Sequence, residues 1–349
     1  MRRNQSLLTL SSDFDSAQNR AIVLAEFGKR GKLRFIPEFP KSRIMMNSSI
    51  FCASASRREF IKVAAVGAAG ALWGAPGHAA EVPYVKLAGL QVPLLGMGTG
   101  VKAGNRSNAL QRSGEKNFHE TVRRAWDEGV RLFDCADSYG SLPMVAKTLK
   151  DKPRESYVLV TKIWCHAQGG IPDNEPRDDS KAVIERFLLE AGTDHIDLVQ
   201  LHCQTAADWT KSYRPHMDAL AEAKQKGWIK AHGCSCHSLE ALEAAAIDPW
   251  VDVVHARINP WGVKMDGPAK VVVPVLKKIH DAGKGIIGMK LIGEGEFRND
   301  PAKIDETLKF VLDLGCIDAL IVGFENQNEI IDYKKRLTSA LEAKEKAKA

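Results

Sequence analysis

The sequence predicts a (β/α)8 TIM barrel over residues 81–349, with a β-hairpin at its N-terminal end. Strand-like apolar runs alternate with helix-like segments along this part of the chain, which is typical of a parallel sheet. Polar side chains follow several of the apolar runs, at the strand ends where barrel enzymes carry their chemistry. A doubly wound open sheet is the alternative. No Gly-x-Gly-x-x-Gly follows the first strand to support it, and its edges would need covering.

The individual elements follow from short-range signals. In residues 85–99, Gly89, Pro93 and Gly96 punctuate short apolar runs, which predicts a hairpin that plugs the barrel floor and then the first strand. Seven more strands are expected over Val130–Phe133, Tyr157–Lys162, Ile196–His202, Ile229–Ser235, Val251–Ile258, Gly285–Leu291 and Ala319–Gly323. The helices expected between them are Phe118–Glu128, Ser141–Leu149, Ser180–Ala191, Pro215–Lys226, Ser238–Ala246, Val271–Ala282 and Lys303–Leu314. Several of these end next to a glycine, as at Gly315, which matches a helix C-cap.

Two loops at the strand ends stand out. Residues 101–117 are rich in positive charge, so they either close over an anionic substrate or cofactor phosphate or form a solvated insertion. The cations of this loop are Lys102, Arg106, Arg112 and Lys116. Residues 166–179 are rich in Gly, Pro and Asp and are expected to shape the substrate pocket. The Lys-rich tail from Glu342 is interpreted as a solvated helix end or a frayed terminus.

The net positive charge of the chain comes entirely from its first 80 residues. The 349 residues carry a formal net charge of +6, but residues 1–80 hold twelve Lys and Arg against five Asp and Glu. The remaining residues hold 37 basic and 38 acidic side chains, a net charge of −1. Nucleic-acid binding by the folded part therefore lacks electrostatic support, and no nucleic-acid partner is expected.

An export signal is expected ahead of the barrel. Residues 56–62 read Ser-Arg-Arg-Glu-Phe-Ile-Lys, an Ala/Gly/Val stretch follows to Ala75, and small residues occupy 77–80. This build resembles a twin-arginine signal, which implies a periplasmic or secreted protein whose partner is the twin-arginine translocation machinery. The apolar run is shorter than the roughly 20 residues of a membrane span, so no stable span is expected. An amphipathic surface helix is the alternative, but it does not explain the cleavage-like tail.

The signal lies far from the first methionine. Such signals sit within about 15 to 30 residues of the start, whereas more than 50 residues precede this one. Translation from Met45 or Met46 would give a leader of ordinary length. We therefore interpret residues 45–80 as the signal peptide and residues 1–44 as an untranslated or disordered extension.

Four short motifs hold the candidate catalytic residues at strand tips. They are Asp134-Cys-Ala-Asp-Ser-Tyr139, Thr161-Lys162-Ile-Trp164, Leu201-His202-Cys203 and Gly233-Cys-Ser235. Tyrosine is a poor acid at neutral pH, and an adjacent ammonium is expected to lower the pKa of Tyr139 by favouring the phenolate. Asp134 would hold Lys162 charged and in place, while His202 orients a substrate oxygen. Taken alone, each of these residues has an ordinary structural role, as a cap or turn residue, a packed aromatic, a surface charge or a core histidine. Together they form a proton-donor set.

This set resembles the catalytic tetrad of the aldo-keto reductase superfamily, and the resemblance covers roughly residues 86–333. Asp134 and Tyr139 keep the family's spacing of five. The resemblance implies an oxidoreductase that transfers hydride between a nicotinamide cofactor, NAD(P)(H), and a carbonyl or alcohol substrate such as an aldehyde, ketone or sugar. It implies that Tyr139 is the general acid/base, with Asp134, Lys162 and His202 as its catalytic partners. A barrel that binds a carbonyl or sugar ligand without turnover is the alternative.

The resemblance also implies cofactor-binding positions, which match the family less closely. They are Gly98, Thr99, Ser235, Cys236, His255, Met289, Gly323 and Glu325. Gly98 and Thr99 fit the family's first-strand tip. Ser235 fits the serine that holds the nicotinamide amide, but Cys236 stands where its asparagine partner is usual.

Further departures lie on the later strands. His255 aligns with the glutamine of the sixth strand, and Met289 aligns with the aromatic residue that stacks on nicotinamide. At the last strand, Gly323 and Glu325 belong to a segment that replaces the basic residues gripping an NADP 2′-phosphate. A carboxylate there favours the ribose diol of NAD by charge, while the family favours NADP.

Six cysteines remain after the leader, and most lie beside catalytic or cofactor positions. They are Cys135, Cys165, Cys203, Cys234, Cys236 and Cys316. No spacing matches a zinc site, because Cys234-x-Cys236 is not Cys-x-x-Cys, so no metal is expected. An oxidising compartment would allow disulfides. Reduced cysteines packed in the core are the favoured interpretation.

Overall fold

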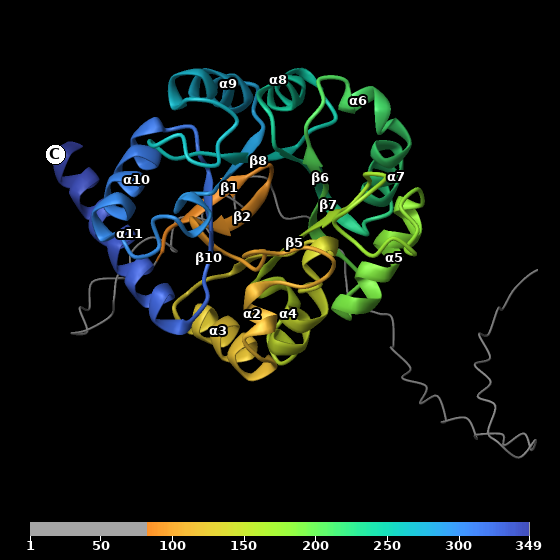
Figure 1. Ribbon diagram of the computed structural model, residues 1–349, viewed down its shortest axis with the longest axis horizontal. Coiled ribbons are helices and arrows are strands. Elements are labelled where there is room, and N and C mark those ends of the chain that lie inside the picture. Colours follow the sequence, from red (N-terminus) through yellow and green to blue (C-terminus); the bar gives the residue numbers. More distant parts are fainter. Residues whose placement is uncertain (1–81, 349) are drawn as a thin grey trace, which may run out of the picture. The chain divides into compact units, whose positions relative to one another are not determined.

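The computed structural model describes residues 82–348, and these form eight parallel strands closed into a barrel (Figure 1). Each strand pairs with its neighbours in chain order, and the last strand closes the barrel by pairing with the first. The barrel strands are β3 (Leu95–Gly98), β4 (Leu132–Asp134), β5 (Val158–Ile163), β6 (Ile196–Gln204), β7 (Ile229–Cys236), β8 (Val253–Arg257), β9 (Gly285–Met289) and β10 (Ala319–Gly323). This topology confirms the predicted (β/α)8 barrel, and the doubly wound alternative is wrong.

A two-stranded hairpin precedes the barrel, as expected. β1 (Tyr84–Leu87) and β2 (Leu90–Pro93) pair antiparallel through a two-residue turn whose backbone lies in the left-handed region. Leu87 and Val92 of the hairpin are fully buried and belong to the same apolar cluster as the inward-facing barrel residues. The hairpin therefore covers one end of the barrel interior.

The barrel interior is filled by apolar side chains. Every residue of β5 is buried, and so is nearly every residue of β6, because helices cover the outer face of the sheet. The inward-facing cluster contains Leu132, Val158, Val160, Leu198, Ala231, Val253, Ile287, Ala319 and Ile321. Burial on both faces explains why the strands read as continuous apolar runs in the sequence.

Helices surround the strands in Figure 1, and the long helices between strands begin and end within three residues of the predicted ones. The long ones between strands are α3 (Glu115–Asp127), α4 (Leu142–Leu149), α5 (Ser180–Ala191), α7 (Arg214–Gln225), α8 (Leu239–Ile247), α9 (Ala269–Asp281) and α10 (Pro301–Leu314). Short helical turns lie in the loops: α2 (Ala109–Arg112), α6 (Trp209–Ser212), η1 (Asp137–Tyr139), η2 (Arg154–Ser156) and η3 (Gly293–Gly295). α10 ends at Gly315 with a φ of 67°, the left-handed C-cap that the sequence predicts.

The C-terminal helix is longer than the sequence indicates. α11 (Gln327–Lys348) contains 22 residues, and only its Lys-rich end from Glu342 is anticipated as a helix end. Ile330, Tyr333 and Leu337 are its buried residues, and they lie on one face. This narrow apolar stripe explains why the periodicity of the segment is weak.

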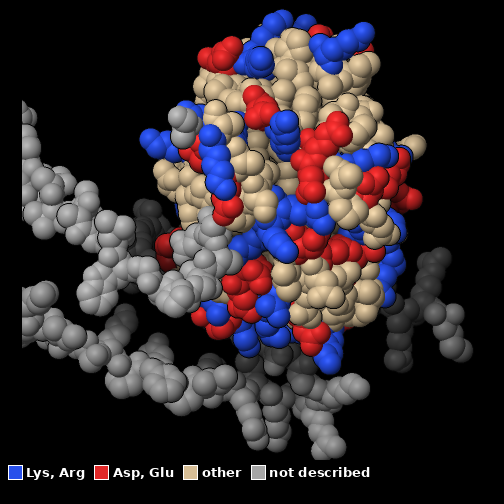
Figure 2. All heavy atoms as spheres, turned by 90° about the vertical axis from the view of Figure 1, so that its left-hand side faces the viewer, with Lys and Arg blue, Asp and Glu red and all other residues tan. Residues whose placement is uncertain are grey.

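The surface of the described residues carries mixed charge. Figure 2 shows Lys and Arg lying next to Asp and Glu on the face that it presents, in keeping with the near-zero net charge of this part of the chain. No helix within residues 82–348 combines the length and the apolar character that crossing a bilayer requires. The expected extension over 1–44 and the expected signal over 45–80 lie outside the described residues.

Candidate active site

The neighbouring ends of β4 and β5 hold a buried ion pair. Lys162 Nζ donates to Asp134 Oδ1, and it also donates to the backbone carbonyl of Cys135 at 2.9 Å. The Asp134 side chain is 7% exposed and that of Lys162 is 1% exposed. Burial by itself raises the pKa of Asp134, but Lys162 and His255 outweigh burial and hold that pKa below its usual value. Each charge therefore depends on its partner to remain in a dry site.

Tyr139 and His202 meet beside this pair. Tyr139 ends η1, directly after β4, and its hydroxyl lies 3.4 Å from His202 Nε2. Ser138 Oγ lies 3.3 Å from the other ring nitrogen, Nδ1. Burial, reinforced by Lys162, lowers the pKa of His202 well below its ordinary value, so the imidazole is neutral. The structure thus brings Asp134, Tyr139, Lys162 and His202 together at one end of the barrel.

The acidity of Tyr139 differs from the sequence-based expectation. Burial, followed by the negative charge of Asp134, raises the pKa of the Tyr139 phenol well above its ordinary value. Lys162 Nζ lies 5.2 Å from the centre of the tyrosine ring, but its hydrogen bonds go to Asp134 and to a backbone carbonyl. The expected acidification is absent chiefly because burial disfavours the charged phenolate, and the negative charge of Asp134 adds to this effect. The phenol is therefore protonated at neutral pH.

Ser235 and His255 are neighbours on β7 and β8, and His255 lies close to the ion pair. His255 is 1% exposed, and its Nε2 lies 3.2 Å from Asp134 Oδ1. That contact is not aligned as a hydrogen bond, so both ring nitrogens are buried without a partner among the described residues. Ser235 Oγ accepts a hydrogen bond from the backbone of Cys203 at 2.8 Å. Cys203 has a φ of 59° where the β6–β7 register shifts, a bulge of the kind that re-aims side chains near active sites.

A cleft opens beside Tyr139, bounded by β3, β9, β10 and the loop after β9. Its empty volume, counted to its open mouth, is about 600 Å³. The expected cofactor positions Gly98, Met289 and Gly323 line it, together with Asp134. A larger groove lies between α10 and α11, but none of the expected site residues lines that groove.

Three cations line this cleft, and each faces a carboxylate. Lys290 Nζ lies 2.7 Å from Glu294 Oε1. Lys102 Nζ and Arg298 Nη2 both lie 3.6 Å from Glu325 Oε1. Glu325 therefore stands between two cations rather than as a free negative charge. An anion bound in the cleft would meet Lys102 and Arg298, which line it, whereas Glu325 is not among the lining residues.

Two of the expected cofactor residues point elsewhere. Thr99 Oγ1 donates to the backbone carbonyl of Asp134 at 2.8 Å and lies 2.6 Å from Ser141 Oγ, so it fixes the end of β4. Cys236 is fully buried in the apolar cluster between barrel and helices, with its Sγ 3.7 Å from that of Cys234. Successive residues of a strand face opposite sides, so Ser235 and Cys236 cannot serve the same cleft.

The basic loop 101–117 is only partly directed at the cleft. Of its four cations, Lys102 alone lines the cleft. Arg106 pairs with Asp137 and Glu175, and Arg112 donates to the backbone carbonyl of Lys102 at 2.9 Å. Arg106 and Arg112 therefore make their contacts away from the cleft, and of the two alternatives, closure over an anion is open only to Lys102 among these three residues.

Gly100, Glu294 and Arg298 also line the cleft and are missed by sequence reasoning. A Cβ on Gly100 would lie 2.4 Å from the ring of Tyr139, so a residue without a side chain lets the phenol lie against this backbone. Glu294 and Arg298 lie in and beside the Gly293-x-Gly295 segment, which directly follows the seventh barrel strand. A glycine-containing loop at this end of a barrel strand is the signal that points to them.

The six cysteines among the described residues are free thiols, and five of them are buried. Burial raises the pKa of Cys135 and of Cys165 to about 12, which marks both as unreactive. Within residues 82–348, no group of three or more His, Cys, Asp and Glu side chains is arranged to hold a metal ion. The five buried thiols therefore pack in the core, in line with the favoured interpretation, whereas Cys203 is partly exposed.

The side chains that line the cleft suit a nicotinamide dinucleotide. Lys102, Lys290 and Arg298 supply positive charge for phosphate groups at its edge. Among the described residues, both ring nitrogens of His255, which lies beside the cleft residue Asp134, lack a hydrogen-bond partner and offer buried polar atoms to a bound group. Met289 supplies a polarizable surface in the position where an aromatic is usual.

Comparison with known proteins agrees with this geometry. Residues 94–333 match the model of the Aldo/keto reductase family. The chain is 27% identical over 226 residues to "Probable aldo-keto reductase 1" of soybean (Glycine max), a match that covers 62% of each chain. It is 26% identical over 247 residues to "D-threo-aldose 1-dehydrogenase" of a Pseudomonas species, covering 64% of this chain and 73% of that protein. The chain thus spans less than two thirds of the soybean relative's length.

Solved structures support the fold. A putative aldo-keto reductase from Pseudomonas aeruginosa superposes with a TM-score of 0.59 at 23% identity, covering 74% of this chain and 96% of that one. The family match covers most of the chain, and its residues 94–333 include all four residues of the expected tetrad. The chain therefore belongs to the aldo/keto reductase family.

Proposed function

We propose that this protein is an exported oxidoreductase that transfers hydride between NAD(P)(H) and a carbonyl or alcohol substrate, with Tyr139 as the general acid/base. The observation that carries the proposal is the contact of Tyr139 with His202 beside the Asp134–Lys162 pair, at the inner end of the cleft. A proton donor, an orienting imidazole and a fixed positive charge then surround one point where a substrate oxygen can sit.

The four residues have distinct roles in this proposal. In reduction, the protonated phenol of Tyr139 donates its proton to the substrate oxygen, and in oxidation the phenolate accepts it back. His202 is neutral, so its Nε2 orients the substrate oxygen without competing as an acid. Lys162 stabilises the phenolate by its positive charge, and Asp134 keeps Lys162 charged and in place. When bound, the nicotinamide supplies or accepts the hydride.

The cofactor preference rests on Glu325 and its two cationic neighbours. A bound adenosine ribose near Glu325 would present either a diol or a phosphate. Glu325 favours the diol of NAD, while Lys102 and Arg298 can neutralise the phosphate of NADP. We propose NAD on the charge of Glu325, against the family's tendency toward NADP.

The names of relatives, rather than the residues of the cleft, indicate a substrate class. One relative bears the name of an aldose dehydrogenase, and two others are named "Methylglyoxal reductase DkgA" and "Pyridoxal reductase, chloroplastic". These names describe a sugar and two carbonyl compounds. We propose that the substrate is an aldehyde, a ketone or a sugar.

Export would place the enzyme where free nucleotide is scarce. The motif at residues 56–62 supports a twin-arginine route, which moves folded proteins with cofactor already bound. A cofactor held tightly through export, and recycled between two substrates, would fit this location.

The test is to purify the protein from the exporting compartment and assay it for retained nucleotide. Nucleotide release on denaturation, followed by NAD(P)H-dependent reduction of aldehydes and sugars, is the expected result. Tyr139→Phe should lower kcat by about 10² to 10⁴ while leaving cofactor affinity unchanged. Retained wild-type turnover in Tyr139→Phe would refute the assignment, and ligand binding without turnover or nucleotide would favour a non-catalytic barrel.

A further inference from the structure

The backbone around Tyr139 is held by a single neighbouring loop. Arg106 N donates to the carbonyl of Ser138 at 3.0 Å, and Asn108 Nδ2 donates to the carbonyl of Tyr139 at 3.1 Å. Gln111 Nε2 completes the series by donating to the carbonyl of Gly140 at 2.8 Å. Three consecutive carbonyls therefore accept hydrogen bonds from the loop after β3. Few contacts within η1 itself can orient Tyr139, because a one-turn 3-10 helix closes only one or two bonds of its own.

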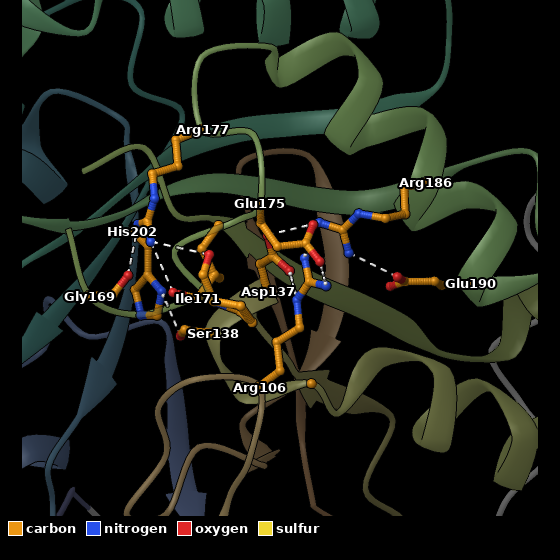
Figure 3. A network of polar contacts seen from close by, with 12 residues as sticks. Arg106, Asp137, Ser138, Gly169, Ile171, Glu175, Arg177, Arg186, Glu190 and His202 are labelled. Atoms are coloured by element: carbon orange, nitrogen blue, oxygen red, sulfur yellow. Dashed lines mark hydrogen bonds and ion pairs between the residues drawn. The ribbon is translucent and has the colours of Figure 1, made fainter. Parts of the chain in front are cut away.

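An ion network fixes the same segment from its other side. Asp137, the first residue of η1, is a buried carboxylate between two guanidinium groups (Figure 3). Its Oδ1 accepts from Arg106 Nε at 3.0 Å, and its Oδ2 accepts from Arg186 Nη2 at 2.8 Å. Arg186 also donates to Glu190 at 2.8 Å, within α5. The segment that carries Tyr139 is thereby joined to α5 as well as to the loop after β3.

Arg106 extends this network to the loop after β5, the strand that bears Lys162. Its guanidinium donates to both carboxylate oxygens of Glu175, at 2.8 and 3.3 Å. The adjacent Asn105 N donates to the carbonyl of Gly170 at 2.7 Å. Arg106 has a φ of 56°, in the left-handed region, a conformation that persists only where surrounding contacts enforce it. This backbone also approaches Gly140 so closely that a Cβ there would lie 2.3 Å from the Arg106 carbonyl oxygen.

We propose that Arg106 and Asp137 are positioning residues that set the place of the Tyr139 hydroxyl relative to His202 and the substrate. The proposal rests on the proposed function, because it concerns the geometry of proton transfer by Tyr139. Arg106, in the loop after β3, connects these segments. Its backbone amide binds the tyrosine segment, and its side chain links that segment to Glu175 in the loop after β5. Displacement of a catalytic group by about 1 Å can cost a hundredfold in rate, so the network controls kcat rather than affinity.

The test compares Arg106→Met and Asp137→Asn with a matched control in the full-length protein. Glu190→Gln is the control, because it removes an Arg186 contact of the same 2.8 Å length without touching residues 137–140. Both network variants should lower kcat by tenfold or more, with the dissociation constant of the reduced cofactor within twofold of wild type. The double variant should lose less kcat than the product of the two single losses, because both single variants break the same Arg106–Asp137 contact. Arg106→Lys should recover part of the loss, since a lysine restores charge without the forked geometry.

A readout independent of activity separates positioning from loss of structure. Hydrogen exchange at the amides of residues 137–140 should accelerate in Arg106→Met and not in Glu190→Gln, while global unfolding in urea changes little. Wild-type kcat in both folded network variants would overturn the inference, and so would an equal loss of kcat in Glu190→Gln. An inactive wild-type protein would instead refute the proposed function. An active wild-type protein with fully active network variants would refute only the positioning role of Arg106 and Asp137.

Discussion

His255 Nε2 lies 3.2 Å from Asp134 Oδ1, the same oxygen that accepts the hydrogen bond from Lys162 Nζ. One buried carboxylate oxygen thus faces both an ammonium and an imidazole. Burial lowers the pKa of His255, so the imidazole is neutral and the three side chains together carry no net charge. Removing Lys162 or Asp134 alone would leave an uncompensated charge in this buried site.

Breaking this pair should cost both activity and stability. Lys162→Met leaves the Asp134 carboxylate buried without its partner, and such a loss typically costs about 3 to 5 kcal/mol in the free energy of unfolding. The double variant Lys162→Met/Asp134→Asn should be less destabilised than the sum of the single variants, since both charges are gone. Urea denaturation and kcat measure the two effects. Lys147→Met, which breaks an exposed ion pair, should stay near wild type in both. Additive losses in the double variant would show that the two residues act separately.

Glu325 should bias the enzyme toward NAD. Two like charges about 4 Å apart repel by roughly 1 kcal/mol in water and about 4 kcal/mol at an effective dielectric of 20. Glu325→Ser removes this repulsion and frees Lys102, while Arg298 keeps its ion pair with Glu329, so the variant should bind NADPH several-fold or more tightly and NADH with little change. Fluorescence titration with both reduced cofactors is the measurement. Glu120→Ser removes a surface carboxylate of the same charge and should leave the ratio unchanged. Tight NADPH binding by the wild type would defeat the proposal.

Buried neutral histidines should make the protein less stable in mild acid. Burial lowers the pKa of His202 well below its ordinary value and, with Arg257, lowers that of His237 to about 3. The unfolded chain takes up a proton at each near pH 6.5, so stability present above that pH is lost as the pH falls. Each such histidine contributes at most about 1.4 kcal/mol per pH unit. The urea midpoint should fall as the pH is lowered from 7.5 to 5. His237→Gln should reduce the slope of the free energy of unfolding against pH by the equivalent of about one bound proton. An identical slope in the variant would contradict this account.

Export should depend on the paired arginines. Replacing Arg57 and Arg58 with lysine should strand the precursor in the cytoplasm, as cell fractionation and immunoblotting would show. The same change at Arg2 and Arg3, in the interpreted extension, should leave export intact. Normal export of the first double variant would indicate a different route. Tryptic peptides from residues 4–20 in the precursor would contradict a start at the internal methionines.

The order and number of the barrel strands could be predicted because they depend on local properties. Parallel strands covered on both faces require apolar residues at nearly every position, which produces uninterrupted runs such as Val158–Ile163. Glycines such as Gly315 mark helix ends because the left-handed C-cap excludes most side chains. α11 escaped prediction because its buried positions are few, and charged residues occupy the rest of its surface. The expected tetrad follows from the same logic, since its members lie at or just beyond the ends of adjacent barrel strands.

By itself, the sequence determined that Asp134, Tyr139, Lys162 and His202 would stand at one end of a barrel. Only the tertiary structure decided which of the remaining polar side chains face the cleft and which are already paired. Arg106 reads as a free cation, yet its guanidinium contacts Asp137 and Glu175, which lie 31 and 69 residues away along the chain. Ionic partnership depends on the approach of loops that are distant in sequence, so no local pattern records which charges are neutralised.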